Sequence, residues 1–254
     1  MRDNTFYEKC KRYIKEEKKE LKADHIFLFG NNEKKRFSKI IKAKIHCVGN
    51  IRNNSYPIQR IKKKKKIKFI MFVSHHNEQD YKEAGYRIEE DKKLFNLLYK
   101  FCKKKGIQLG LCSKLNSSQE IFFRNSFAKG NWVYYPHFNT RKTYELLNKQ
   151  QMIVFDWSTL GFEALAKGLK CVAFYKNFPV EGHYVKYPKS GFFWTNSKNY
   201  NDLEKTLNRV IKSSNKRWKK VVDKYSSELI NYDANNIKAK KILNNLLKKN
   251  KIQN

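Results

Sequence analysis

The sequence lacks the cysteine patterns that staple small domains or hold zinc. Its five cysteines are scattered and no two form a CxxC pair, which predicts reduced thiols and excludes a disulfide framework. The longest apolar runs, such as FIMFV at 69–73, are too short to cross a bilayer. The first residues, MRDNTFYEKC, contain no apolar stretch of the secretory type. We therefore expect a cytoplasmic protein, either soluble or peripheral on a membrane.

Acidic residues are also scarce. The chain has 23 Asp and Glu against 56 Lys and Arg, for a net charge of +33. Such a charge favours a polyanionic neighbour, whether nucleic acid, an anionic membrane or a phosphorylated substrate, although lysine-rich coding bias explains part of it equally well. The aromatic residues fall at core spacing and match no nucleic-acid signature. A basic nucleic-acid-binding module remains an alternative, and nucleic acid is not the partner we expect.

What is present is enough apolar sequence for a large core. Apolar residues make up 40% of the chain, with 18 Phe and 15 Tyr among its 254 residues. From residue 67, short apolar runs alternate with segments of helical periodicity, and the last 50 residues are helical throughout. This alternation predicts an α/β fold with a Rossmann-like parallel sheet, helices on both faces and a helical C-terminus.

The first 60 residues form a separate, shorter pattern. We expect a helix over 4–22, a strand over 25–29, a short helix over 33–41 and a strand over 44–48. The turn-rich residues 49–57 and the lysine run Lys62–Lys66 then predict a linker. The expected division is a partial N-terminal α/β segment over 1–60 and a ligand-binding domain over 61–254.

One stretch, VFDWSTLGFEALAKGLKCVAFY (154–175), stands out because polar residues lie between two buried-looking strands. Ser158 occupies the expected N-cap of a helix beginning near Thr159, and the free N–H groups of such a helix end suit a diphosphate. Gly161 would let a ligand approach the first turn. Glu163 lies on an otherwise apolar helix, so its carboxylate needs a partner. Ser158 and Gly168, taken singly, are equally explained as ordinary helix caps.

The residues STLGFEALAKGLKCVAF resemble the donor-nucleotide motif of GT-B glycosyltransferases. Together with GFFWTN (191–196) and NYDANNIKAKKIL (231–243), the stretch is similar to O-antigen and other surface-polysaccharide biosynthesis proteins. The resemblance covers roughly residues 67–245. It implies a glycosyltransferase of the GT-B type that binds a nucleotide-sugar and transfers the sugar to an acceptor hydroxyl of a glycan or lipid-linked acceptor. It also implies chemistry without a bound metal or a cofactor other than the nucleotide-sugar substrate.

Carried over by residue, the resemblance places Ser158 and Thr159 at the donor phosphates and Glu163 at the ribose. It also implies an N-terminal domain as large as the C-terminal one, whereas about 60 residues precede the junction here. Two further readings follow: a non-catalytic donor-binding half that needs a partner chain, or a degenerate paralogue.

Two other loops follow predicted strands and open on the same side of the sheet. Ser74 and His75 could contact the donor phosphates, and His75 is our candidate for an acid toward the leaving group. His137, Asn139 and Thr140 could line the pocket of the base. The alternative for the first group is a solvated polar loop, and for the second it is a proline-containing loop that caps the next helix.

The run Lys62–Lys66 has two readings as well. It could meet the anionic inner face of the cytoplasmic membrane, or it could be a solvated linker.

Overall fold

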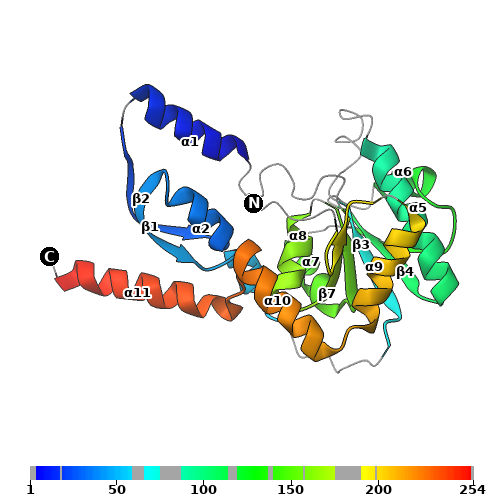
Figure 1. Ribbon diagram of the computed structural model, residues 1–254. Coiled ribbons are helices and arrows are strands. Elements are labelled where there is room, and N and C mark those ends of the chain that lie inside the picture. The colour runs from blue at the N-terminus through cyan, green and yellow to red at the C-terminus, as the bar shows by residue number, and fades with distance from the viewer. Residues whose placement is uncertain are drawn as a thin grey trace.

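The computed structural model describes residues 4–17, 19–58, 66–74, 87–113, 119–136, 140–156, 158–174, 190–197 and 199–252. In that part of the chain, two sheets are flanked by helices (Figure 1). A two-stranded parallel sheet lies near the N-terminus, and a six-stranded parallel sheet is built from later residues.

The larger sheet contains β3 (Phe69–Val73), β4 (Gln108–Cys112), β5 (Val133–Tyr135), β6 (Met152–Phe155), β7 (Lys170–Phe174) and β8 (Trp194–Thr195). Its strand order is β5-β4-β3-β6-β7-β8, and all neighbours are parallel. Counted from β3, this is the 3-2-1-4-5-6 order of the doubly wound nucleotide-binding sheet. The predicted fold class is confirmed. The last strand, β8, was not predicted, because a strand of two residues is too short to show periodicity in the sequence.

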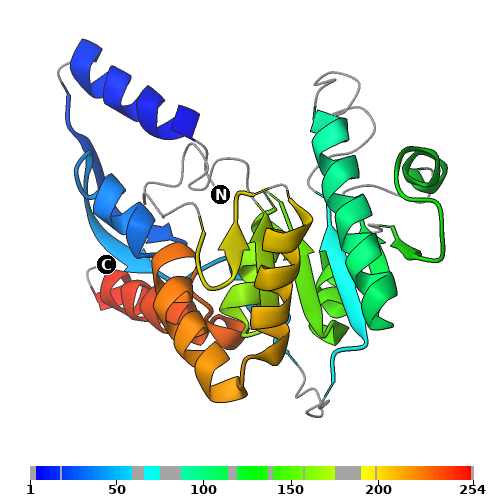
Figure 2. The ribbon, with the colours of Figure 1, turned by 45° about the vertical axis from the view of Figure 1, so that its right-hand side comes forward.

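Helices cover both faces of this sheet, as Figure 2 shows. On one face, α5 (Arg87–Lys105) packs beside α9 (Tyr200–Lys212). On the other, α7 (Thr140–Lys149) and α8 (Thr159–Ala166) lie side by side, and α10 (Asn215–Leu229) packs outside α8. The short helix α6 (Gln119–Ser126) connects β4 to β5.

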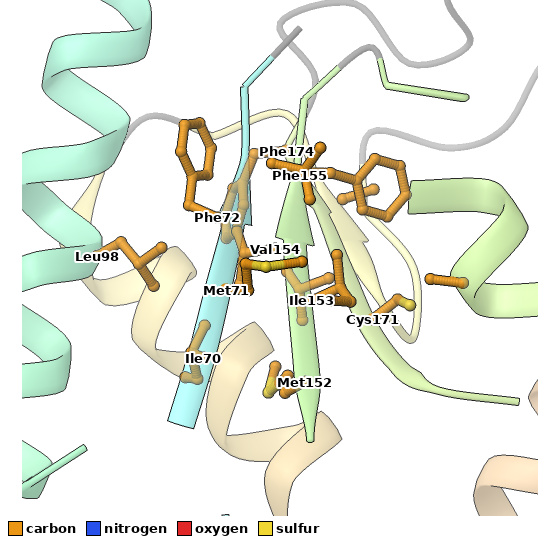
Figure 3. Close-up of a cluster of buried hydrophobic side chains, with 14 of the residues drawn as sticks. Ile70, Met71, Phe72, Leu98, Met152, Ile153, Val154, Phe155, Cys171 and Phe174 are labelled. Carbon is orange, nitrogen blue, oxygen red and sulfur yellow. The ribbon is translucent and has the colours of Figure 1, made fainter. Parts of the chain in front are cut away.

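The core lies where β3 and β6 meet. Figure 3 shows Met71, Phe72, Ile153 and Val154 stacked between the helical layers, all completely buried. Strands buried on both faces are expected to be continuously apolar, and the runs FIMFV and MIVF have this character. Apolar runs were therefore a sufficient signal for the central strands.

The small sheet pairs β1 (Leu21–Leu28) with β2 (Ile41–Cys47), and α2 (Asn31–Phe37) connects them. Helix α1 (Asn4–Glu17) packs against α2 through the ring of Tyr7, which contacts the Phe37 ring. The predicted helix over 4–22 was too long, because residues 21–22 already pair with β2. Similarly, β1 is longer than the predicted 25–29, and α2 ends before Ile41, which begins β2.

The junction segment (residues 48–58) connects the two sheets and was expected to be a linker of turns. It contains a helix of one turn, α3 (Ile51–Asn54), capped by the Asn50 side chain. Residues 231–236 pack against it: the Asp233 N–H donates to Asn54 Oδ1 at 3.1 Å, and Asn236 Nδ2 donates to Ile51 O at 3.0 Å. The 3-10 turn η1 (Ala234–Asn236) then leads into α11 (Ile237–Ile252). The chain thus returns from the large sheet to the small one.

Candidate functional site at the switch point of the sheet

The strand order defines where a ligand would bind. The chain builds the large sheet outward from β3 through β4 to β5, then starts again at β6 and proceeds the other way. In open parallel sheets, the crevice beyond the carboxyl ends at such a reversal is the usual ligand site. Because Val73 pairs with Phe155, the residues that follow these two strands meet at this point. We call Ser74, Asp156, Ser158 and Thr159 the switch-point edge.

Ser158 holds the N-cap position of α8 with an extended backbone, as expected, but its hydroxyl makes no capping hydrogen bond. The N-cap serines and asparagines elsewhere in the fold behave differently: Ser214 accepts from the Arg217 N–H at 3.2 Å, and Asn199 from the Asp202 N–H at 3.0 Å. The first turn of α8 also contains no acidic side chain. The positive end of this helix is therefore not neutralised from within its own first turn.

The remaining predicted residues lie at several places. Ser74 is buried directly after β3, and its N–H donates to Cys112 O at 3.0 Å. Thr140 is the first residue of α7 and half-buried. The predictions for His75, His137 and Asn139 fall outside the described residues.

The structure explains the two glycines of the motif, Gly161 by packing and Gly168 by its backbone conformation. A Cβ on Gly161 would overlap the Phe155 ring, so this position must be glycine for the helix to lie on β6. Gly168 has φ of +89° and ends the helix, with its N–H donating to Leu165 O at 2.8 Å. A ligand role for Gly161 stays a prediction.

Glu163 is buried, with 2% of its surface exposed, and both oxygens of its carboxylate have partners. Tyr144 Oη of α7 donates to Oε2 at 2.9 Å, and Asn50 Nδ2 of the junction segment donates to Oε1. Burial raises the pKa of this carboxyl, while the hydrogen bonds from Tyr144 and Asn50 and the charge of Lys167 act in the opposite direction. The sequence required a partner for this carboxylate. It did not show that the partners lie 19 and 113 positions away.

A second buried charge lies one turn further along. Lys167 Nζ donates to Tyr56 O at 2.6 Å and to Asn148 Oδ1 at 2.9 Å, and it lies over the Tyr144 ring. Burial lowers the pKa of Lys167 to about 8, against a smaller opposite effect of Glu163. Sequence reasoning missed this residue, because a lysine near a helix end ordinarily reads as solvated. Together, Glu163 and Lys167 tie α7 and α8 to the junction segment.

The described residues contain neither a cluster of metal ligands nor a helix that could span a membrane. No group of three or more His, Cys, Asp or Glu among them is arranged to hold a metal ion. None of the helices in the described ranges combines the length and the apolar character that a bilayer crossing needs. Of the lysine run Lys62–Lys66, only Lys66 is described, so the prediction for the run lies outside the structure.

Comparison with known proteins places this architecture in a class. The fold is similar to that of the wall teichoic acid polymerase TagF, with a TM-score of 0.56 at 14% identity, over 89% of this chain and 58% of the polymerase. A variant of the same polymerase soaked with CDPG matches with a TM-score of 0.51 at 12% identity, over 89% of this chain and 57% of that one. A UDP-N-acetylglucosamine 2-epimerase from Listeria monocytogenes also matches, over 79% of this chain and 52% of the epimerase, at 15% identity and a TM-score of 0.49. The likeness to the polymerase shows that the fold is of the GT-B type.

The family follows from the sequence itself. Residues 4–250 match the family described as "putative O-antigen biosynthesis protein". The chain belongs to this family of O-antigen biosynthesis proteins. No curated protein matches the sequence, and the chain spans about 58% of the length of the polymerase it resembles.

Proposed function

We propose that this chain binds the diphosphate of a nucleotide-activated sugar at the switch-point edge and takes part in glycosyl transfer during surface-polysaccharide synthesis. The observation that carries the proposal is the unused N-cap of α8: Ser158 directs no hydroxyl bond to its own helix, at the point where the sheet reverses direction. Backbone N–H groups at such a helix end are natural donors to phosphate oxygens. Family membership supports the surface-polysaccharide context.

Within this site, Ser158 and Thr159 would donate to the phosphates, and Ser74 would reach them from the neighbouring strand β3. The buried Glu163 would accept from the ribose hydroxyls. Each of its oxygens accepts one hydrogen bond from the protein and has a second lone pair for a sugar hydroxyl. Tyr144 and Asn50 would hold the carboxylate in place for that contact.

In the transfer step, the phosphate contacts would stabilise the negative charge that develops on the leaving nucleotide as the bond to the sugar breaks. The acceptor hydroxyl would attack the anomeric carbon and lose its proton to a base. His75 remains our candidate for the acid toward the leaving group. Neither step requires a metal ion on this proposal.

The test is binding of UDP, GDP, CDP and CMP to the purified chain, followed by thermal shift and calorimetry. At least one should raise the melting temperature, and Thr159→Val and Glu163→Ala should weaken its binding. Ser214→Ala is the matched control, because Ser214 is the N-cap of α10 and lies away from the switch-point edge. If none of the four nucleotides stabilises the chain, the donor site is wrong.

Binding without transfer is the second candidate. It is favoured by one observation: in the described residues the N-terminal sheet has two strands, against six in the other sheet. This candidate predicts nucleotide affinity with no release of nucleotide from any donor sugar. Addition of a partner chain that supplies further N-terminal structure would then restore turnover.

A further inference from the structure

The C-terminal helix α11 exposes leucines that the rest of the fold leaves uncovered. Leu243 is 46% exposed and Leu247 is 61% exposed. The two residues are four apart and therefore lie one turn above each other on one face. Figures 1 and 2 show α11, in red, on the opposite side of the two-stranded sheet from α1.

The start of this helix is firmly attached. Asp233 caps it with both oxygens, which accept from the N–H groups of Lys238 and Ala239 at 3.1 Å each. Lys238 Nζ also donates to Cys47 O at 3.2 Å, and Ala239 is buried. The leucine face thus has a fixed direction relative to the body of the protein.

The charge of α11 has one sign. Its sequence, IKAKKILNNLLKKNKI, contains six lysines and no acidic residue. Lys240 lies one turn before Leu243 on the same side of the helix, while Lys241 and Lys248, seven residues apart, lie about 130° around the helix from the two leucines. All three are exposed, and no ion pair within the described part of the chain engages them.

We infer that α11 docks on an anionic membrane surface, with Leu243 and Leu247 inserted at the headgroup boundary and Lys240 against the lipid phosphates. Exposed leucines beside a lysine, on a helix whose charges are all positive, are typical of helices that lie in a membrane interface. The charge decides among possible partners, since the lysines repel a second copy of this +33 chain and attract an anionic bilayer. This surface is separate from the switch-point edge, and the inference does not depend on nucleotide binding.

The test is co-sedimentation of the whole chain with vesicles of phosphatidylcholine alone and of phosphatidylcholine with phosphatidylglycerol. We expect binding only to the anionic vesicles, weakening with salt. The double variant Leu243→Ser, Leu247→Ser should lose about tenfold or more in partition. The matched control is Ile51→Ser with Ile121→Ser, which removes two exposed apolar side chains that lie outside α11.

Each outcome decides the inference. Because all four side chains are exposed, we expect both double variants to melt at the wild-type temperature, which would show that folding is unaffected. Binding that is lost equally in both variants, or retained in the leucine variant, would overturn a docking role for α11. Binding to an oligonucleotide that ignores the leucines, or a dimer that the leucine variant dissociates without any vesicle binding, would assign this face to nucleic acid or to a second copy instead.

Discussion

Tyr144 Oη donates a 2.9 Å hydrogen bond to Glu163 Oε2, joining two helices that lie on the same face of the large sheet. The acceptor is a carboxylate that is almost completely removed from water. A buried carboxylate without its donors is costly, so this bond bears on the stability of the fold as well as on the proposed contact with ribose.

The Tyr144→Phe variant tests the first of these roles. It leaves Oε2 of Glu163 without its donor and should lower the free energy of unfolding by about 1–3 kcal/mol, measured by urea denaturation. Tyr13→Phe is the control, because Tyr13 is an exposed residue on α1. Equal stabilities of the two variants would show that the hydrogen bond contributes nothing.

Because the ammonium group of Lys167 is buried, the free energy of unfolding should depend on pH in the alkaline range. Its pKa in the folded chain is about 8, below the ordinary value of 10.5, so the unfolded chain binds more protons between these values. The free energy of unfolding therefore receives a contribution from this group that rises as pH increases from about 8 towards 10.5.

Lys167→Met should remove that contribution. We expect a less stable protein, because the hydrogen bonds to Tyr56 and Asn148 are lost, with a flatter dependence of stability on pH in this window. Urea denaturation at several pH values measures both effects. Lys149→Met, at an exposed position near the end of α7, should keep the wild-type slope. A wild-type slope in the Lys167 variant would contradict the burial of this charge.

The two serine N-caps should respond differently to removal of their hydroxyls. Ser214→Ala deletes a bond to the Arg217 N–H and should cost about 1 kcal/mol in the free energy of unfolding. Ser158→Ala deletes no capping bond, so its cost should be a few tenths of that. If the proposed donor site is correct, calorimetry should show that Ser158→Ala weakens nucleotide binding and that Ser214→Ala does not. Equal stability losses would mean that Ser158 caps α8 in solution.

Gly161 and Phe155 should behave as a coupled pair. In a helix interior, alanine is usually more favourable than glycine by about 1 kcal/mol. At position 161 its methyl group would overlap the Phe155 ring, so Gly161→Ala should instead destabilise the fold by about 1–3 kcal/mol.

A double-mutant cycle with Phe155→Ala identifies the cause of that loss. The double variant should be more stable than the sum of the single losses predicts, because the space left by the ring accommodates the new methyl group. Additive losses would show that the glycine is required for another reason, such as close approach of a ligand.

Much of the large sheet could be predicted from the sequence, because its signals are local. Buried parallel strands are continuous apolar runs, and the amphipathic helices between them repeat apolar residues every three or four positions. The ends of α8 could also be predicted from local signals, a serine before the first turn and a glycine after the last. The errors in element boundaries occurred where strand pairing determines the structure. Residues 21–22 have charged neighbours in the sequence that favour a helix, but they pair with β2.

The segment 231–236 shows a different limit. The role of its residues became visible only from their contacts with the junction segment, which lie 179 and 185 positions earlier in the chain. Asn235 and Asn236 both have φ of 58°, a backbone that asparagine tolerates better than most residues. A turn signal alone could not predict what the turn would contact.

The α/β class, the apolar core, the strong positive charge and the motif that surrounds Glu163 could all be predicted from the sequence, since each depends on residue type and short-range spacing. The partners of the two buried charges became known from the folded chain: Asn50 and Tyr144 for Glu163, and Tyr56 and Asn148 for Lys167. The fold also leaves Leu243 and Leu247 uncovered. Burial and pairing depend on which distant segments of the chain come into contact, and the spacing of residues along one helix carries no information about those contacts.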